Sequence, residues 1–368
     1  MSNKLKKRQL AYYITPHGFG HAVRSIEVIR HLLSQGPEVE IDVVSTIPEF
    51  LLHQNLTQPL PLRAKQLDIG LVQQDSIRFD LIATLEALES LHLNQDALVS
   101  EEIDFLRNRG IQAVVCDIPF LPFVAAAHAN IPAIGISNFT WDWIYEAYIS
   151  SDSRWSVLVD WIRKCYQKCD LFLQLPMHGD CSVFPKIQDV PLVTRKAQRE
   201  REETRKILNL GLDQKVYLVS FGFLDLEETA QNRVEDINHA VFLFKHPLSF
   251  RFSNGICLDD LPLSYADVVG AVDGVITKPG YGIVADCLAH STPMIYADRG
   301  FFPEYDILVQ EMGKHLTTVY LSSADLYAGK WRSAIEALEK LPRVTPTLPC
   351  NGAEVCAEII LNFLDTYQ

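Results

Sequence analysis

Short apolar runs separated by amphipathic segments recur along most of this 368-residue chain. Residues 10–14 have the composition of a buried strand, and residues 23–34 carry Ile26, Ile29 and Leu33 on one face of a helix. Strands that alternate with helices form βαβ units, in which the strands are parallel and helices cover the sheet. The pattern therefore predicts an α/β protein.

The alternation occurs twice, and 368 residues suffice for about two domains of ordinary size. We expect a doubly wound, Rossmann-like domain at 1–185 and a second one at 186–350. A C-terminal segment at 351–368, with an amphipathic helix at 354–364, is expected to pack back on the first domain. Ligands of doubly wound sheets bind beyond the carboxyl ends of the strands, so two such domains predict a cleft where they face each other.

Charge and cysteine usage exclude several classes of function. The formal net charge is −13, which argues against a nucleic-acid partner because such proteins present a basic face. The eight cysteines form no Cys-x-x-Cys pair, so no zinc-binding spacing appears. No signal-peptide pattern follows Met1, and we expect a cytoplasmic protein. The basic cluster at 4–8 supports at most a peripheral contact with a membrane.

A second charge feature is the run at 195–206, which contains Arg195, Arg199, Arg201 and Arg205 among glutamates and lysines. Runs of this kind usually form a solvated helix face. The run also lies where the first alternating series ends and the second begins. We therefore expect an exposed helix near the domain boundary.

A glycine turn follows the first expected strand, with the sequence Thr-Pro-His-Gly-Phe-Gly-His at 15–21. Glycines let the backbone bend tightly and let a ligand approach closely, and the next helix offers free amide groups. Val23 occupies the last position of a Gly-x-Gly-x-x-Gly motif, so a dinucleotide site is not predicted. His17 and His21 bracket the glycines, either as functional groups or as helix-capping side chains.

The second half contains a similar turn, Lys-Pro-Gly-Tyr-Gly at 278–282, between an expected strand at 274–277 and a helix. Backbone amides at a helix start, together with the charge of Lys278, suit a diphosphate. The alternative is an ordinary turn with a surface lysine, and the P-loop motif is absent. A third turn at 220–222 can supply more amides to the same phosphates.

These segments resemble GT-B glycosyltransferases, above all the glycosyltransferase-like N-terminal region of plant L-arabinokinases and its stand-alone bacterial relatives. The matching segments are 12–24, 138–145, 189–193 and 278–284. A more distant similarity is to the N-acetylglucosaminyltransferase of lipid II synthesis. The resemblance implies a GT-B architecture that binds a nucleotide sugar in the C-terminal domain and the acceptor mainly in the N-terminal domain. It does not imply sugar kinase activity.

The resemblance also implies roles for individual residues. His21 corresponds to a general base, since imidazole accepts a proton near neutral pH, and Asp117 corresponds to the acid that orients it. Asp117 is alternatively a helix N-cap. The remaining expected contacts are Gly20, Gly222, Lys278, Gly280, Tyr281 and Gly282 for the donor diphosphate, Asp286 and Glu304 for the donor ribose or sugar, and His17, Arg24, Trp141 and Asp142 for the acceptor or sugar.

Two of these assignments have structural alternatives. Glu304 is alternatively a carboxylate that favours a helix start, and the tryptophans around Asp142 are alternatively part of the core. Asp286 stands where relatives commonly carry a glutamate, and its side chain is one methylene shorter.

Three functions remain open at this point. The first is an inverting, metal-independent glycosyltransferase that moves a hexosyl or N-acetylhexosaminyl group from a nucleotide-diphosphate sugar, preferably a UDP-sugar, to an unknown hydroxyl acceptor. The second is a sugar-nucleotide 2-epimerase, and the third is a sugar-nucleotide-binding protein without turnover. No cofactor or metal is expected, because the donor half contains no obvious Asp-x-Asp motif.

Overall fold

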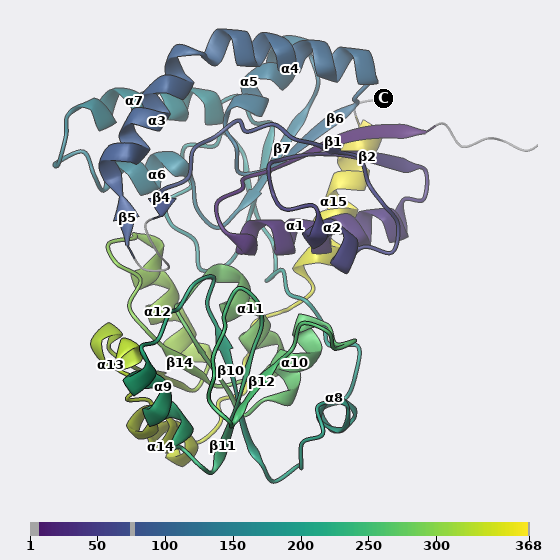
Figure 1. The fold of residues 1–368 in the computed structure, drawn as a ribbon. Coiled ribbons are helices and arrows are strands. Elements are labelled where there is room, and N and C mark those ends of the chain that lie inside the picture. Colours follow the sequence, from purple (N-terminus) through teal and green to yellow (C-terminus); the bar gives the residue numbers. More distant parts are fainter. Residues whose placement is uncertain (1–6, 74–77, 367–368) are drawn as a thin grey trace, which may run out of the picture. The chain divides into compact units, whose positions relative to one another are not determined.

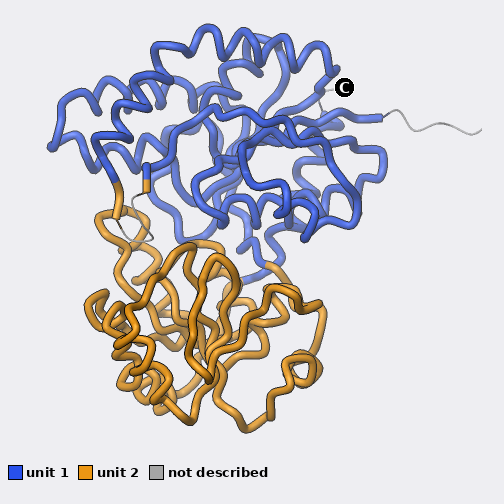
Figure 2. Tube along the Cα trace, viewed as in Figure 1, with its two compact units in different colours: residues 1–72, 80–194, 349–368 blue, residues 73–79, 195–348 orange. Residues whose placement is uncertain are grey.

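The computed structural model describes residues 7–73 and 78–366. The chain divides into two compact units, which Figure 2 shows in different colours. Unit 1 comprises Met1–Val72, Asp80–Thr194 and Pro349–Gln368, and unit 2 comprises Gln73–Phe79 and Arg195–Leu348. Each unit contains one parallel sheet with helices, so the predicted α/β class is confirmed.

Unit 1 has a seven-stranded sheet in the order β3-β2-β1-β6-β7-β8-β9, and all its strand pairs are parallel. The central strands are buried along almost their whole length, as expected when both faces of a parallel sheet are covered. The strands are β1 (Arg8–Ile14), β2 (Val39–Val44), β3 (Leu62–Arg63), β6 (Ala113–Asp117), β7 (Ala133–Ser137), β8 (Leu171–Gln174) and β9 (Ile187–Asp189). The two-residue strands β4 (Val72–Gln73) and β5 (Phe79–Asp80) form a separate sheet.

The helices of unit 1 include one that the sequence pattern did not indicate, α7 (Arg154–Tyr166), whose buried face contains Trp155 and Ile162. In Figure 1, α4 and α5 lie along one face of the sheet, and α1 lies along the other. The remaining helices are α1 (Phe19–Gln35), α2 (Phe50–Asn55), α3 (Leu81–Leu93), α4 (Gln95–Arg109), α5 (Leu121–Ala129), α6 (Trp141–Glu146) and α15 (Gly352–Thr366).

The last helix, α15, lies against α1 in unit 1, although the two are far apart in sequence (Figure 1). Ile360 on its inner face is completely buried. The helices approach so closely that a Cβ atom on Gly36 would lie 2.7 Å from Leu361 Cδ2. Arg8 Nη1 also pairs with Asp365 Oδ1 at 2.7 Å. The end of the chain is thus a layer of the first unit.

Truncating Ile360 tests how much of the stability of unit 1 depends on this helix. Ile360→Ala leaves a cavity between α15 and α1, and we expect unfolding to become easier by about 2–5 kcal/mol. Glu358→Ala on the exposed face of the same helix is the matched control, and its midpoint should stay close to that of the parent chain. Thermal melts followed by circular dichroism measure both, and equal melting of the two variants would contradict the packing role.

Unit 2 has a six-stranded parallel sheet in the order β12-β11-β10-β13-β14-β15. Its strands are β10 (Lys215–Ser220), β11 (Ala240–Phe244), β12 (Gly255–Cys257), β13 (Gly274–Thr277), β14 (Met294–Tyr296) and β15 (Thr318–Tyr320). Its helices are α8 (Arg201–Ile207), α9 (Glu228–Glu235), α10 (Tyr265–Ala271), α11 (Tyr281–His290), α12 (Glu304–His315), α13 (Ser323–Tyr327) and α14 (Arg332–Lys340).

An aromatic core packs between one face of this sheet and the helices α9, α13 and α14. Trp331 is completely buried there, its ring lies 5.6 Å from that of Phe242, and its Nε1 donates to the carbonyl of Leu326 at 2.9 Å. Val219 and Ile276 on the central strands belong to the same cluster. The core therefore anchors β10 and β13, whose carboxyl ends carry the turns of interest.

The charged run at 195–206 differs from the exposed helix predicted for it. Helix α8 begins only at Arg201, and Arg205 is completely buried. Its guanidinium donates to Asp273 Oδ2 at 2.7 Å and to the carbonyl of Ala271 at 2.9 Å, and Arg199 Nη1 lies 3.0 Å from Asp267 Oδ2. Buried carboxylates and carbonyls need donors, and the arginines of this run supply them. Only part of the run faces solvent.

Removing the Arg205 guanidinium should destabilise unit 2 strongly. Arg205→Met leaves Asp273 short of a partner and several carbonyls without donors, and we expect a loss on the order of 3 kcal/mol. The neighbouring Lys206 is exposed, so Lys206→Met should change little. Calorimetric melting of both variants checks this, and a small loss for Arg205→Met would restore the interpretation of the run as a solvated face.

Candidate active site

The order in which strands are added to the sheet of unit 1 reverses between β1 and β6. From β1 it continues to β2 on one side, whereas β6 lies on the other side of β1. Loops that follow two such strands diverge and leave a crevice, where ligands of doubly wound sheets bind. Gly18 begins α1 here with φ of +73°, a conformation that favours glycine. This turn brings His21 opposite the end of β6.

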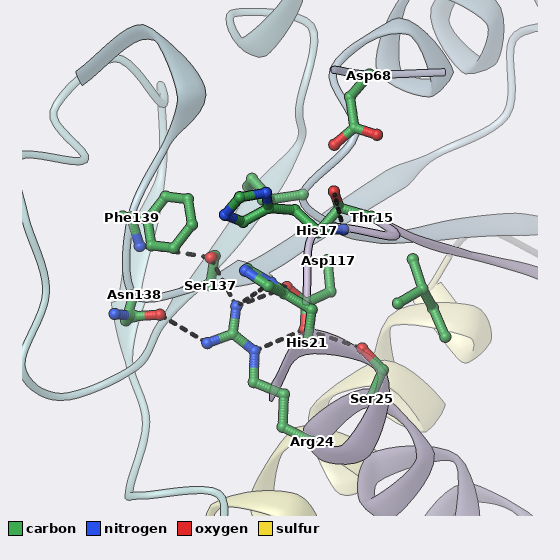
Figure 3. Close-up of polar contacts among 12 residues, drawn as sticks. Thr15, His17, His21, Arg24, Ser25, Asp68, Asp117, Ser137, Asn138 and Phe139 are labelled. Carbon is green, nitrogen blue, oxygen red and sulfur yellow. Dashed lines mark hydrogen bonds and ion pairs between the residues drawn. The ribbon is translucent and has the colours of Figure 1, made fainter. Parts of the chain in front are cut away.

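His21 and Asp117 form a hydrogen-bonded pair at this point (Figure 3). His21 Nδ1 lies 2.8 Å from Asp117 Oδ1, and both side chains are buried. The ring of Phe139 stands perpendicular to the imidazole, with 5.2 Å between the ring centres. Asp117 caps no helix, because α5 begins at Leu121 without a side-chain cap. The alternative interpretation of Asp117 as an N-cap is therefore wrong.

Arg24, one turn after His21, points inward to the same carboxylate instead of outward. Its Nε donates to Asp117 Oδ2 at 2.7 Å and its Nη2 to Asp117 Oδ1 at 2.6 Å. Its Nη1 donates to Asn138 Oδ1 at 2.6 Å. The guanidinium that we expected at the acceptor is thus a clamp on Asp117. Burial alone would raise the pKa of Asp117, but the charges of Arg24 and His21 outweigh it and hold that pKa well below its usual range.

Trp141 and Asp142 lie in the interior of unit 1, contrary to their expected contact with a sugar. Trp141 is completely buried, and Asp142 is 4% exposed and pairs with Arg163 of α7 at 3.2 Å. The interpretation of this tryptophan as a core residue is therefore right. Its ring stands perpendicular to that of His17, with 5.1 Å between the ring centres, so Trp141 packs against His17.

Asp68 is a buried acid that the sequence analysis did not single out. Its Oδ2 accepts from Trp141 Nε1 at 2.8 Å, and its Oδ1 is buried without a hydrogen-bond partner. Burial raises the pKa of Asp68 to about 6, and hydrogen bonds with Thr15 and Trp141 offset only part of this effect. Figure 3 shows its position beside Thr15 and His17. Its one signal in the sequence is that an acidic residue stands between two apolar residues, Leu67 and Ile69.

The raised pKa of Asp68 predicts a pH-dependent effect of Asp68→Asn. The folded pKa of about 6 exceeds the ordinary value of 3.8, so protonation stabilises the fold below pH 3.8 and this contribution is lost as pH rises through 6. At pH 8 the amide removes a buried charge, and we expect stabilisation on the order of 1–3 kcal/mol. This difference should shrink as pH falls through 6, and the two chains should melt together only below pH 3.8, where Asp68 is protonated in both states.

Melting temperatures of both chains between about pH 3.5 and pH 8 measure this difference. Asp104→Asn, an exposed exchange on α4, is the control and should give parallel curves. A constant offset between Asp68→Asn and the parent chain at all pH values would show that Asp68 does not titrate in this range.

Unit 2 has the same kind of reversal between β10 and β13, which are neighbours in its sheet. Ser220 pairs in register with Thr277, and the Thr277 hydroxyl donates to the carbonyl of Ser220 at 2.6 Å. A Cβ atom added at Gly222 or Gly280 would meet no atom within 4 Å, so both turns expose their backbone. Gly280 is the N-cap of α11, and a glycine offers no side-chain acceptor to the first amides of the helix.

The other expected donor contacts divide into two groups. Lys278 directly follows β13, and Tyr281 and Gly282 open α11, so these three lie at the turn, where the Tyr281 side chain is buried. Asp286 and Glu304 are buried and already paired: Asp286 with Arg195, and Glu304 Oε2 with Arg299 Nη1 at 2.5 Å. Gly20 lies in α1 of unit 1.

Three further features of the described residues bear on the expectations. No group of three or more histidine, cysteine or acidic side chains there is arranged to hold a metal ion. No helix in the same ranges is both long and apolar enough to cross a membrane. In the basic cluster at 4–8, Lys7 pairs with Glu40 and Arg8 with Asp365, whereas residues 4–6 lie outside the described residues.

Comparisons with known proteins bear on the fold and on the family resemblance. No family model matches the chain. L-arabinokinase of Arabidopsis thaliana is 29% identical over 384 residues, which cover 98% of this chain. The chain spans only 35% of the length of that relative.

Solved structures match over nearly the whole chain. The calicheamicin glycosyltransferase CalG4 has a TM-score of 0.61 at 18% identity, with 99% of this chain and 98% of that one covered. The fold is that of the GT-B glycosyltransferases. UGT89C1 of Arabidopsis thaliana, solved with UDP-L-rhamnose, gives a TM-score of 0.58 at 13% identity, over 98% of this chain and all of that one. The spinosyn forosaminyltransferase SpnP has a TM-score of 0.60 at 13% identity, with 99% of this chain and 96% of that one covered. The predicted GT-B architecture and the resemblance to L-arabinokinase are confirmed.

Proposed function

We propose that this chain is a glycosyltransferase that moves a sugar from a UDP-sugar to a hydroxyl group of an acceptor, with inversion and without a metal ion. The observation that carries the proposal is the buried pair of His21 and Asp117 at the point where the sheet of unit 1 reverses. When Nδ1 donates a hydrogen bond to a carboxylate, the proton of the neutral ring is on Nδ1, and Nε2 is the basic nitrogen. Such a nitrogen suits the removal of a proton from a hydroxyl.

Unit 2 supplies what the leaving group requires. As the acceptor oxygen attacks the anomeric carbon, the bond to the diphosphate breaks and negative charge grows on the diphosphate. The amides at the start of α11 and the ammonium group of Lys278 stabilise that charge in place of a metal ion. The backbone at Gly222 and Gly280 lets phosphate oxygens approach closely. The UDP and UDP-sugars named with several solved neighbours support uridine as the donor base.

A binding protein without turnover is the second candidate, and one observation favours it. The similar L-arabinokinase is much longer than this chain, so the matched part can serve another activity in that protein. Both candidates predict donor binding, and only the first predicts a dependence of sugar transfer on His21.

Thermal shifts with UDP and a panel of UDP-sugars test the proposal. We expect one of them to stabilise the parent chain, by about 2.7 kcal/mol at a hundredfold excess over its dissociation constant. Lys278→Ala should lose most of this shift, whereas Lys340→Ala, an exposed exchange on α14, should keep it. No shift with any nucleotide would contradict both candidates.

His21→Gln separates the two candidates. It should bind the donor as the parent does but lose roughly 10²–10⁴-fold in transfer to a hydroxyl acceptor, measured by NMR of the products. Transfer that survives this exchange would reject the base, and donor binding with no product from the parent chain would favour the binding protein.

A further inference from the structure

Arg299 connects the glycine turn at 278–282 of unit 2 to the start of a neighbouring helix. Its side chain is 9% exposed and comes from the loop between β14 and α12. Its Nη1 donates to the carbonyl of Pro279 at 3.2 Å and to Glu304 Oε2 at 2.5 Å. This nitrogen carries two hydrogens, one for each acceptor. Pro279 belongs to the turn before α11, and Glu304 begins α12, which packs beside α11 (Figure 1).

The guanidinium of Arg299 is fixed in this orientation by its surroundings. Its Cζ lies 4.1 Å from the centre of the Phe302 ring, which in turn packs on Phe79 with 5.7 Å between the ring centres. A planar guanidinium that stacks on a ring and pairs with a carboxylate has little freedom to rotate. Arg299 Nε is buried without a hydrogen-bond partner, which costs free energy. The contacts of Nη1 and the ring therefore determine the orientation.

The hydrogen bond to Pro279 also sets the direction of the next amide. Among the described residues the cis peptide bonds lie elsewhere, so the bond between Pro279 and Gly280 is trans. The C=O and the N–H of a planar trans peptide point in opposite directions. Because the carbonyl points to the buried Arg299, the N–H of Gly280 points away from it. A Cβ atom at Gly280 would meet no atom within 4 Å, so the turn is open at this residue.

We propose that Arg299 is a positioning residue for the donor diphosphate: by holding the carbonyl of Pro279, it directs the N–H of Gly280 toward the phosphate oxygens. A carbonyl that accepts from a cation also polarises its own peptide, so the same N–H becomes a stronger donor. Arg299 acts through the peptide and does not need to touch the nucleotide. The inference rests on the proposed function, because that proposal assigns the diphosphate to this turn.

Titration calorimetry of the full chain with UDP and with uridine tests the inference. Uridine has no phosphate, so the ratio of the two dissociation constants isolates the contribution of the diphosphate. We expect Arg299→Met to weaken UDP binding by about ten- to a hundredfold, the range for a hydrogen bond to a charged group. Binding of uridine should stay unchanged. A merely structural role of Arg299 would weaken both probes alike.

Arg201→Met is the matched control. Arg201 also donates to a backbone carbonyl, that of Val272 at 2.9 Å, and pairs with Asp273, but both partners precede β13 instead of following it. This variant should keep the ratio of the parent chain. If Arg299→Met fails to fold, Arg299→Lys keeps a charge for Glu304. Its single nitrogen should stay with the carboxylate and release the carbonyl, so the same loss of UDP binding is expected.

NMR tests the direction of the peptide without any ligand. Labelling with ¹⁵N-glycine reports on the 18 glycines of the chain, and Gly280→Ala identifies the signal of Gly280. Alanine is tolerated there, because φ is −143° and the space for a Cβ is open. The ¹⁵N shift of an amide responds to hydrogen bonds accepted by the carbonyl of the same peptide. Arg299→Met should therefore move the Gly280 signal, and Arg201→Met should not.

Two results would overturn the inference: an unchanged ratio of UDP to uridine binding in the folded Arg299 variants, or an unchanged Gly280 signal in them. Failure of the proposed function looks different. A parent chain whose UDP binding depends on Arg299 but that transfers no sugar would reject the transferase and leave the role of Arg299 intact. A parent chain that does not bind UDP would reject the diphosphate contact together with the proposed function.

Discussion

The ion pair between Arg24 and Asp117 is the contact on which the first unit's site depends. A buried carboxylate without compensation is so unfavourable that it would take up a proton, and a protonated Asp117 could not hold His21 as it does. Two parallel hydrogen bonds from the guanidinium keep the acid ionised and fix its orientation. Because Arg24 comes from α1, Asp117 from β6 and Asn138 from the end of β7, one guanidinium also holds together the elements that surround the crevice.

Sheet topology explains why both units place their candidate groups where they do. In each unit the chain leaves a central strand in one direction and later returns on the other side, between β1 and β6 and between β10 and β13. The two loops at such a point diverge, and the helices α1 and α11 begin there behind glycine N-caps. Unit 1 fills this position with an imidazole and a carboxylate, and unit 2 fills it with glycine turns and Lys278. The same backbone arrangement thus suits proton transfer in one unit and an anion in the other.

The sequence predicted those features that depend on local pattern, and it missed those that depend on distant side chains. Alternating apolar runs located the central strands, and the resemblance to GT-B glycosyltransferases singled out His21 after the first glycine turn and Asp117 at the end of a strand. The contacts of Arg24 and Asp68 could not be found in this way, since their partners lie far along the chain and leave no periodic signal. The run at 195–206 misled for the same reason: its arginines alternate with exposed glutamates, while Asp273, the acid that pairs with Arg205, comes from a different part of unit 2.

Arginine pairing also explains why the buried acids of this protein behave differently from one another. Asp117 is matched by Arg24, Asp286 by Arg195 and Glu304 by Arg299, each through a direct ion pair. Asp68 has only the indole N–H of Trp141 and a threonine, and the ionised Asp117 raises its pKa further. The clamp that keeps one acid charged therefore makes a second charge nearby less favourable. Trp141 contacts both His17 and Phe139, and Phe139 contacts His21, so a chain of packed rings connects Asp68 with the groups around the proposed base.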